Sequence, residues 1–174
     1  MSGASASAGD AATVSVTVAA EPAVAFAVFT GELDRWWRRG PRFRGRNPGV
    51  LILEPRLGGR LFEQSAAAGV PLIERGVVTQ WEPPLRLAFQ WHVPDAQPVA
   101  AAPAHASILE TLVQVGFEAV PGGTRVTVRH SGWADVPPEH PARHGALGLA
   151  MSRRIGLWWG ELLSALREHL QTHC

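Results

Sequence analysis

From Gly49 to Gly132 the chain repeats one pattern, in which apolar and polar residues alternate over short stretches bounded by glycine and proline. A period of two is typical of a strand with one buried face. The Pro121-Gly122-Gly123 sequence predicts a tight hairpin, because glycine adopts the positive φ angles of such reversals. With an earlier alternating stretch, the pattern predicts seven antiparallel strands, at residues 13–20, 50–55, 60–64, 72–81, 85–91, 108–120 and 124–133.

The last part of the chain has a helical period instead. Apolar residues recur every three or four positions from Leu147 to Leu170, which predicts one amphipathic helix of about 45 Å at 1.5 Å per residue. Two short helices are expected between the first two strands, one from Pro22 to Gly31 and one at residues 33–38. The order predicts an α+β fold, in which the long helix covers the apolar face of a curved antiparallel sheet.

The length of 174 residues suits a single domain, which we place at residues 13–174. Residues 1–12 are almost entirely Ala, Ser and Gly, and we expect a disordered tail there. A flexible loop is expected at residues 93–106, which are rich in Pro and Ala. No stretch approaches the ~18 apolar residues of a membrane span. The single cysteine, Cys174, excludes an intrachain disulfide, so a cytoplasmic protein is expected.

The composition excludes several chemistries. All 16 residues counted as Lys or Arg are arginine, and tyrosine is absent. Without lysine there is no Schiff base, no P-loop phosphate grip and no lysine general base. Sequence motifs for hydrolase nucleophiles, helical zinc sites and dinucleotides are also missing, so we expect no metal and no nucleotide cofactor. The formal net charge of +1 creates no global field that would attract nucleic acid or an anionic membrane.

Several short motifs follow one another in a characteristic order between about residues 13 and 170. Each is weak alone, but their order and spacing together are specific for one family. The motifs are Val16-Thr17-Val18 with Pro22, Ala25-Phe26 and Phe29; Trp36-Trp37; Glu54-Pro55-Arg56 with Gly58-Gly59-Arg60; Gly76-Val77 with Trp81, Pro83-Pro84, Leu87 and Trp91; Thr124-Arg125-Val126 with His130 and Gly132-Trp133; and Trp159 with Leu162, Leu163 and Leu166.

On these motifs the chain resembles the START-like superfamily, and within it the branch named after the C-terminal domain of the heat-shock-protein-90 ATPase activator. The resemblance implies a helix-grip fold, a curved antiparallel sheet of about seven strands wrapped around a long C-terminal helix. In this fold a ligand lies between the concave face of the sheet and the helix. Because the fold hosts transfer proteins, cyclases, resistance proteins and co-chaperones, it does not define one activity.

The residues that would line such a cavity are those that alternation or helical spacing turns inward. Any one of the aromatic side chains is also explained as ordinary core. Their number favours a binding site, because indole combines a large apolar face with an N–H donor. The ligand-binding candidates are Trp36, Trp37, Phe62, Phe89, Trp91, Val113, Phe117, His130, Trp133, Met151, Ile155, Trp158 and Trp159.

Among the polar residues of the predicted cavity, His130 is the candidate acid, base or hydrogen-bonding group. The alternative is a core histidine with satisfied nitrogens. Glu63 and Glu74 lie on strands whose faces the sequence does not fix; we expect them to be exposed, and a buried carboxylate there would be a second candidate. Gly156 and Gly160 interrupt the long helix, either for close packing against the sheet or to leave room for a ligand.

Six arginines and three aromatic residues lie between Arg35 and Arg46. They could clamp the phosphates and bases of a nucleic acid, or form a cationic rim at the cavity mouth that attracts a carboxylate or enolate. The near-neutral net charge and the resemblance favour the rim. Two histidine pairs, 140/144 and 169/173, have a spacing that can bind zinc on a helix, but each lacks a third ligand.

We therefore expect a protein that binds an apolar, aromatic or polycyclic small molecule, such as a lipid or polyketide, for carriage, sequestration or resistance. One alternative is a cyclase or aromatase that uses His130 in the same cavity without a metal or nucleotide. Another is a client-binding, stress-response domain related to the co-chaperones. No membrane or nucleic-acid partner is expected, and a homodimer is left open.

Overall fold

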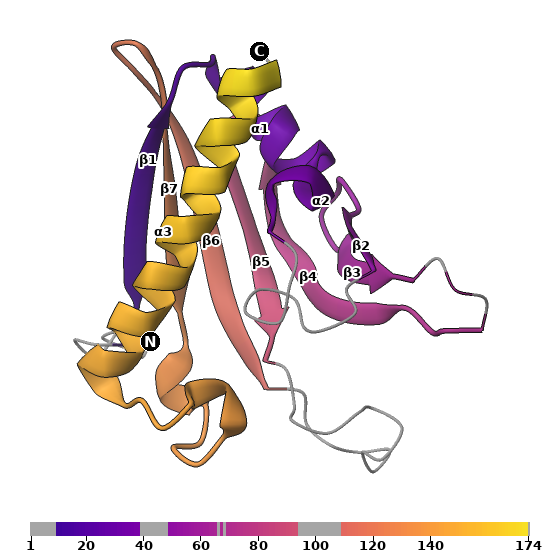
Figure 1. Cartoon of the computed structure of the whole chain (residues 1–174), viewed down its shortest axis with the longest axis vertical. Helices are drawn as coiled ribbons and strands as arrows, with labels where there is room; N and C mark the ends of the chain where they lie inside the picture. Colours follow the sequence, from indigo (N-terminus) through magenta and orange to yellow (C-terminus); the bar gives the residue numbers. More distant parts are fainter. Residues whose placement is uncertain (1–9, 39–48, 66, 68, 94–108, 174) are drawn as a thin grey trace, which may run out of the picture.

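All seven strands join in one antiparallel sheet with the order β1-β7-β6-β5-β4-β3-β2 (Figure 1). The computed structural model describes residues 10–38, 49–65, 67, 69–93 and 109–173. From β2 to β7 each strand pairs with the next one in sequence, and β1 pairs with β7. The strands are β1 (Ala12–Val18), β2 (Val50–Leu53), β3 (Arg60–Gln64), β4 (Ile73–Glu82), β5 (Arg86–His92), β6 (Glu110–Val120) and β7 (Gly123–Ser131).

The helices lie on the concave face of this sheet. Figure 1 shows α3 crossing in front of β1, β7 and β6, while α1 packs on β6 and β7 and α2 packs against β2 on the same side of the sheet. The apolar stripe of α3, which includes Met151, Ile155, Leu162 and Leu166, is buried against the sheet. The α+β helix-grip architecture expected from the sequence is confirmed. The helices are α1 (Pro22–Gly31), α2 (Leu33–Trp36) and α3 (Gly148–His173), with 3-10 helices η2 (Trp133–Asp135) and η3 (Pro141–Arg143).

The β6–β7 hairpin is as tight as its glycines predict. Val120 pairs with Gly123, and the φ angles of Gly122 and Gly123 are 85° and 144°. A Cβ atom on Gly123 would lie only 2.0 Å from the carbonyl oxygen of Val18. Glycine is therefore required there both for the turn and for the close approach of β1.

Two irregularities accompany the curvature of β4. The register shifts between Leu61 and Phe62 in the β3–β4 pair, and between Val78 and Gln80 in the β4–β5 pair. Such bulges bend a strand and increase its twist. Figure 1 shows β4 curving toward β3 and β2. The bend lets the sheet wrap around the helices rather than lie flat beneath them.

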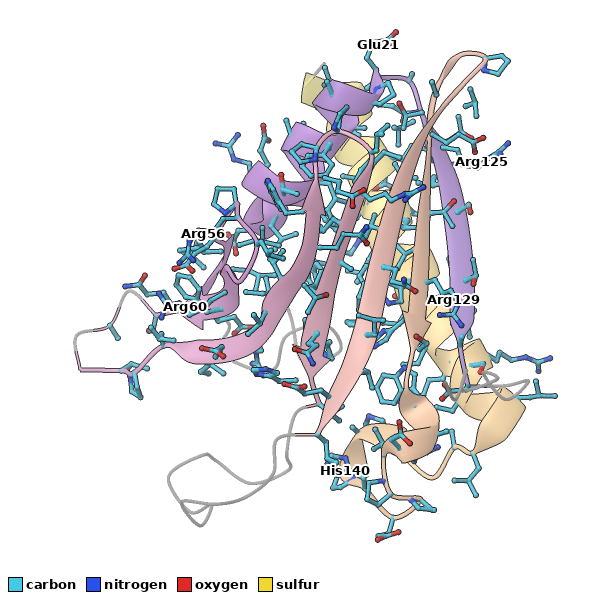
Figure 2. The ribbon with its side chains drawn as sticks, turned by 180° about the vertical axis from the view of Figure 1, so that it is seen from behind. Glu21, Arg56, Arg60, Arg125, Arg129 and His140 are labelled. Carbon is cyan, nitrogen blue, oxygen red and sulfur yellow. The ribbon has the colours of Figure 1, made fainter. Side chains whose placement is uncertain are left out.

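The convex face carries the polar half of the alternation. Arg125 reaches Glu118 at 3.1 Å, and Arg129 donates to Gln114 at 3.3 Å across the same strand pair. Figure 2, seen from behind, shows Arg125 and Arg129 along β7. These polar residues alternate with the buried valines of β7, so the solvent side of the sheet is distinguished from the side that α3 covers.

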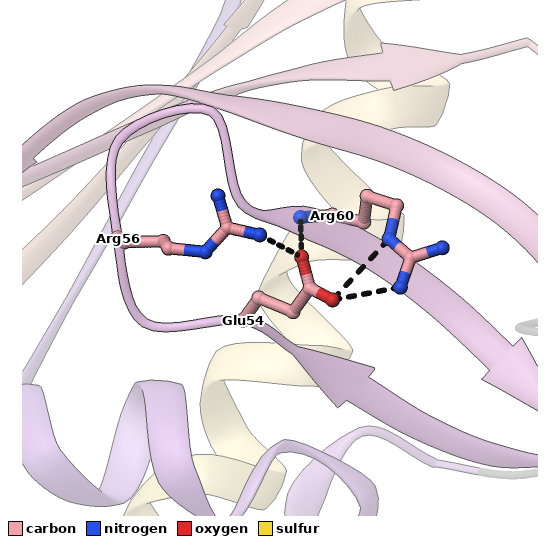
Figure 3. Close-up of polar contacts among 3 residues, drawn as sticks. All are labelled: Glu54, Arg56 and Arg60. Carbon is pink, nitrogen blue, oxygen red and sulfur yellow. Dashed lines mark hydrogen bonds and ion pairs between the residues drawn. The ribbon is translucent and has the colours of Figure 1, made fainter.

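The turn between β2 and β3 is built around one carboxylate. Glu54 accepts hydrogen bonds from the backbone N–H of Arg60 at 2.9 Å and from its guanidinium at 2.8 and 3.2 Å, and Arg56 adds another at 3.1 Å (Figure 3). The side-chain and backbone donors of Arg60 lower the pKa of Glu54 from 4.5 to about 2. Gly59 completes the turn, since a Cβ there would lie 2.2 Å from the Glu54 carbonyl oxygen.

Several boundaries differ from the sequence-based expectations. Trp133 does not extend β7 but begins η2, because Gly132 leaves the strand with a φ of 92°. Leu85 precedes β5 and is 57% exposed, and Leu147 precedes α3 and is 54% exposed, so neither contributes to the core. β1 already begins at Ala12, within the expected tail. The expected tail at residues 1–9 and the 93–106 loop beyond Val93 lie outside the described residues.

We predict that Glu54→Gln lowers the melting temperature at neutral pH, because it removes the charge that the Arg60 donors stabilise. Since the folded pKa lies below the unfolded one, the wild-type advantage is full above about pH 4.5 and disappears as the pH falls toward 2. Circular dichroism melts of both proteins across this pH range measure the difference in melting temperature. Glu139→Gln, at an exposed site, is the control. A pH-independent difference would contradict the prediction.

We predict that Gly160→Ala raises the free energy of unfolding by about 0.5–1 kcal/mol, because alanine is the better helix former. No atom lies within 4 Å of the position that its Cβ would take. Urea unfolding followed by circular dichroism measures the change. Gly123→Ala is the contrasting variant and is expected to destabilise the protein by its clash with Val18. Destabilisation by Gly160→Ala would show that this helix position cannot accept a methyl group.

Candidate functional site

Four tryptophan side chains meet between the concave face of the sheet and α3, and we call them the indole cluster. They are Trp37, which follows α2, Trp91 on β5, and Trp158 and Trp159 on α3. Trp37 stacks on Trp91 with ring centroids 5.7 Å apart and planes inclined by 13°. Trp158 lies 5.8 Å from both of these rings and 5.3 Å from Trp159. Three separate parts of the sequence thus form one continuous aromatic surface.

Beside the indole cluster, His130 links α3 to the sheet through a chain of hydrogen bonds. Trp159 Nε1 lies 3.0 Å from His130 Nδ1, and His130 Nε2 lies 2.7 Å from Thr111 Oγ1. An indole nitrogen can only donate, so Nδ1 is the acceptor and the proton of the neutral ring is on Nε2. That N–H donates to Thr111, whose hydroxyl donates to the Trp91 carbonyl oxygen at 3.4 Å.

The environment keeps His130 neutral. The side chain is fully buried, and burial lowers its pKa from 6.5 to about 3. Both ring nitrogens are already engaged by groups of the protein, whereas a general base needs a nitrogen within reach of its substrate. The geometry favours a structural role in which His130 orients Trp159. A catalytic role for His130 stays a prediction.

Five of the seven indole N–H groups fall into two classes. Trp159 donates to His130, and Trp36 donates to the Phe29 carbonyl oxygen at 3.2 Å. The Nε1 atoms of Trp37, Trp133 and Trp158 are buried and have no hydrogen-bond partner among the described residues. Buried polar groups are normally paired, so three unpaired donors in one region are unusual.

Several of the predicted ligand-binding residues belong to the hydrophobic core that also contains Trp37, Trp91 and Trp159. Phe89, Val113, Met151 and Ile155 are buried in the same core cluster as the indoles, and Trp133 lies 5.1 Å from His130. Their positions support the use of alternation and helical spacing to find inward faces.

Three of the predicted residues do not belong to the indole cluster, for different reasons. Phe117 packs against Phe26 and Phe29 of α1, further along β6. Trp36 contacts Trp37 at 5.5 Å but donates back to α1. Phe62 pairs with Ile52 on the face opposite Leu61, where the Arg60 guanidinium lies 5.1 Å from its ring centroid. The structure therefore does not bring Phe62 together with the other candidates.

Sequence reasoning missed two buried charged groups. Glu63 is 4% exposed and bonds Arg75 at 3.3 Å, so the expectation that it is exposed is wrong, whereas Glu74 is exposed. Glu63 pairs with Leu51, a core residue, and shares its face. This register, which depends on strand pairing, was the missing signal.

The second buried charge is Arg143 of η3. Its guanidinium donates to the carbonyl oxygens of Val136 at 2.7 Å and Ala146 at 3.5 Å, and to that of Trp133. It thereby holds together the segment that connects β7 to α3. No sequence pattern indicated this role, because a single arginine that closely follows several prolines resembles an exposed loop residue.

The described part of the predicted arginine rim is engaged in ion pairs. Arg35 lies 3.5 Å from Glu32, and Arg38 lies 3.2 Å from Glu168 on α3. The other four arginines of this segment, at positions 39, 42, 44 and 46, lie outside the described residues, so neither the rim nor the nucleic-acid alternative is tested.

The histidine pairs have partners of other kinds. His140 Nδ1 accepts the backbone N–H of Ala142 at 3.2 Å, and His169 lies 2.7 Å from Glu32. Within the described residues, no group of three or more His, Cys, Asp or Glu side chains could hold a metal ion.

With this geometry in place, comparison with known proteins identifies the family. Residues 19–170 match the model of the Activator of Hsp90 ATPase homolog 1-like proteins. The chain belongs to this family. The resemblance inferred from the sequence motifs is therefore confirmed, and the structure has the START-like, ligand-binding fold of these proteins. Comparison with curated protein sequences found no match.

Solved structures of low sequence identity share this fold. A protein from Rhodobacter sphaeroides has a TM-score of 0.63 at 20% identity, with 95% of each chain covered. DynU16, from the dynemicin biosynthetic locus, has a TM-score of 0.59 at 18% identity, covering 94% of this chain and 48% of that one. The Aha1 dimer from Colwellia psychrerythraea has a TM-score of 0.54 at 17% identity, covering 92% and 95%.

Membrane insertion through a helix finds no support in the structure. Among the described residues, no helix combines the length and the hydropathy that crossing a bilayer requires.

We predict that the wild-type protein loses stability as the pH falls below about 6.5, because His130 takes up a proton far more readily when unfolded. His130→Gln removes this contribution. The free energy of unfolding of the variant should therefore rise relative to that of the wild type as the pH falls. Urea unfolding of both proteins between neutral pH and about pH 4 measures the difference. His144→Gln, at an exposed position, is the control. Parallel pH profiles for the wild type and His130→Gln would contradict the prediction.

Proposed function

We propose that the protein binds an apolar, aromatic small molecule between the concave face of the sheet and α3, at the indole cluster. The role would be carriage, sequestration or resistance. The observation that carries the proposal is the indole cluster itself, in which Trp37, Trp91, Trp158 and Trp159 contact one another across three elements.

The composition of the cluster supports binding of a planar ligand. Aromatic rings interact favourably with other rings by offset stacking and edge contacts, beyond the area that they bury. A ligand ring entering this region would exchange indole–indole contacts for indole–ligand contacts of the same kind.

The same geometry favours binding over catalysis. A cyclase or aromatase would need an acid or base that reaches the ligand, and the candidate group, His130, has both nitrogens bonded within the protein. Its low pKa also keeps the ring neutral across the physiological range. The buried carboxylate in the described part of the sheet, Glu63, is paired with Arg75.

The comparisons are compatible with this function. The family fold is a ligand-binding fold, and DynU16, which shares it, comes from the dynemicin biosynthetic locus. At 18% identity this similarity supports the fold and leaves the ligand of the present protein to experiment.

We predict saturable binding of N-phenyl-1-naphthylamine, a neutral aromatic probe whose emission rises in an apolar site. Trp158→Ala should weaken the probe's affinity about tenfold, because an indole that contacts the ligand contributes on the order of 1.4 kcal/mol. A fluorescence titration of each protein measures the dissociation constant.

Trp81→Ala provides the matched control for this titration. Trp81 is a partly buried indole that packs on Phe26, away from the indole cluster. It should leave the affinity unchanged, and circular dichroism should show that both variants are folded. Absence of saturable binding to the wild type, or equal losses in the two variants, would contradict the proposed site.

A further inference from the structure

Three indole N–H groups in and beside the indole cluster have no acceptor in the part of the chain that the structure describes, and this distinguishes them from their neighbours. Trp37 and Trp133 are 1% and 5% exposed, so water does not readily replace the missing partner. The Nε1 atom of Trp158 is buried as well. Trp36 and Trp159, in the same region, do have acceptors supplied by the protein. An N–H removed from water without a partner loses a hydrogen bond that folding does not return.

The three rings belong to one connected set of aromatic side chains. Trp37 and Trp158 have centroids 5.8 Å apart. The His130 ring lies 6.3 Å from Trp158 and 5.1 Å from Trp133, and so lies between them. The unpaired donors therefore come from α3, η2 and the residue after α2, and they border the region where we propose that the ligand binds.

These three groups can act only as hydrogen-bond donors. An indole N–H donates and cannot accept, so a ligand that satisfies it must supply an acceptor. An anion would also need a neutralising charge to offset its desolvation. The nearby buried cation, Arg143, is directed to three backbone carbonyl oxygens. A neutral carbonyl oxygen fits the donors without this requirement.

We infer that the site selects planar, apolar molecules that carry carbonyl oxygens over the corresponding hydrocarbons. The inference rests on the proposed function, since it names the ligand class of the same site. The rings of the ligand contact the indole cluster, and its carbonyl oxygen accepts from Trp37, Trp133 or Trp158.

Fluorene and 9-fluorenone form a matched pair of probes, because they share one ring framework and differ by a single carbonyl group. Equilibrium dialysis of each compound against the full chain gives the two affinities. We expect 9-fluorenone to bind about tenfold more tightly, which is the effect of one buried hydrogen bond. If both bind equally, the acceptor preference is overturned while the proposed function survives. If neither binds, the proposed function fails as well.

Replacement of each indole by a ring without the N–H identifies the donor. At least one of Trp37→Phe, Trp133→Phe and Trp158→Phe should lower the ratio of the 9-fluorenone affinity to the fluorene affinity, whatever its effect on the binding of both compounds. Trp81→Phe, outside the indole cluster, should retain the full preference. Retention of the preference in all three variants would overturn the assignment of the donors.

The indole N–H resonances supply a readout that does not depend on mutation. In proton–nitrogen spectra of protein with labelled tryptophan, the fluorene and 9-fluorenone complexes have nearly the same ring contacts. A difference between the two complexes should appear at Trp37, Trp133 or Trp158 and be small at Trp36 and Trp159, whose N–H groups are already bonded. A difference confined to Trp36 and Trp159 would contradict the inference.

Discussion

The apolar concave face of the sheet must be shielded from water, and most of the structure follows from how α3 does this. Val113, Val115, Val126 and Val128 form the central part of that face and are almost completely buried. The hydrophobic effect favours covering this area but, because it is not directional, it does not specify how α3 is oriented on the sheet. The bulges in the β3–β4 and β4–β5 pairs accompany the curvature of the sheet, which lets β4, α1 and α2 enclose the side that α3 leaves open.

The orientation of α3 is set by the hydrogen bonds that run from Trp159 through His130 and Thr111 to the Trp91 carbonyl oxygen. They connect α3 to β7, β6 and β5 in turn. Apolar side chains tolerate small displacements of a helix, whereas a buried hydrogen bond is lost when its atoms separate. This series of hydrogen bonds therefore sets the position of α3 and, with it, the orientation of Trp158 and Trp159, the two members of the indole cluster on this helix. The site and the stability of the fold depend on the same few polar atoms.

Local sequence was a good guide to the elements but not to their ends. The strand expected at residues 60–64 is β3, and the other strands lie within two residues of their expected bounds. The failures share a cause: Trp133, Leu85 and Leu147 continue the alternation or helical spacing of the neighbouring element but lie in the connections. Periodicity identifies which residues could belong to an element, whereas turn geometry, such as the positive φ of Gly132, determines where it ends.

By itself the sequence determined the order of elements, the inward and outward faces of the central strands, the family, and the group of side chains that could line a site. These depend on spacing along the chain, so they can be read without knowing which segments meet. Only the tertiary structure decided that Glu63 is buried, that Phe62 faces away from the other candidates, that His130 has a fixed tautomer, and that three indole N–H groups have no acceptor among the described residues. Each of these depends on strand register or on atoms from distant segments, because a hydrogen bond requires both partners within about 3.5 Å and pairing across the sheet sets that distance.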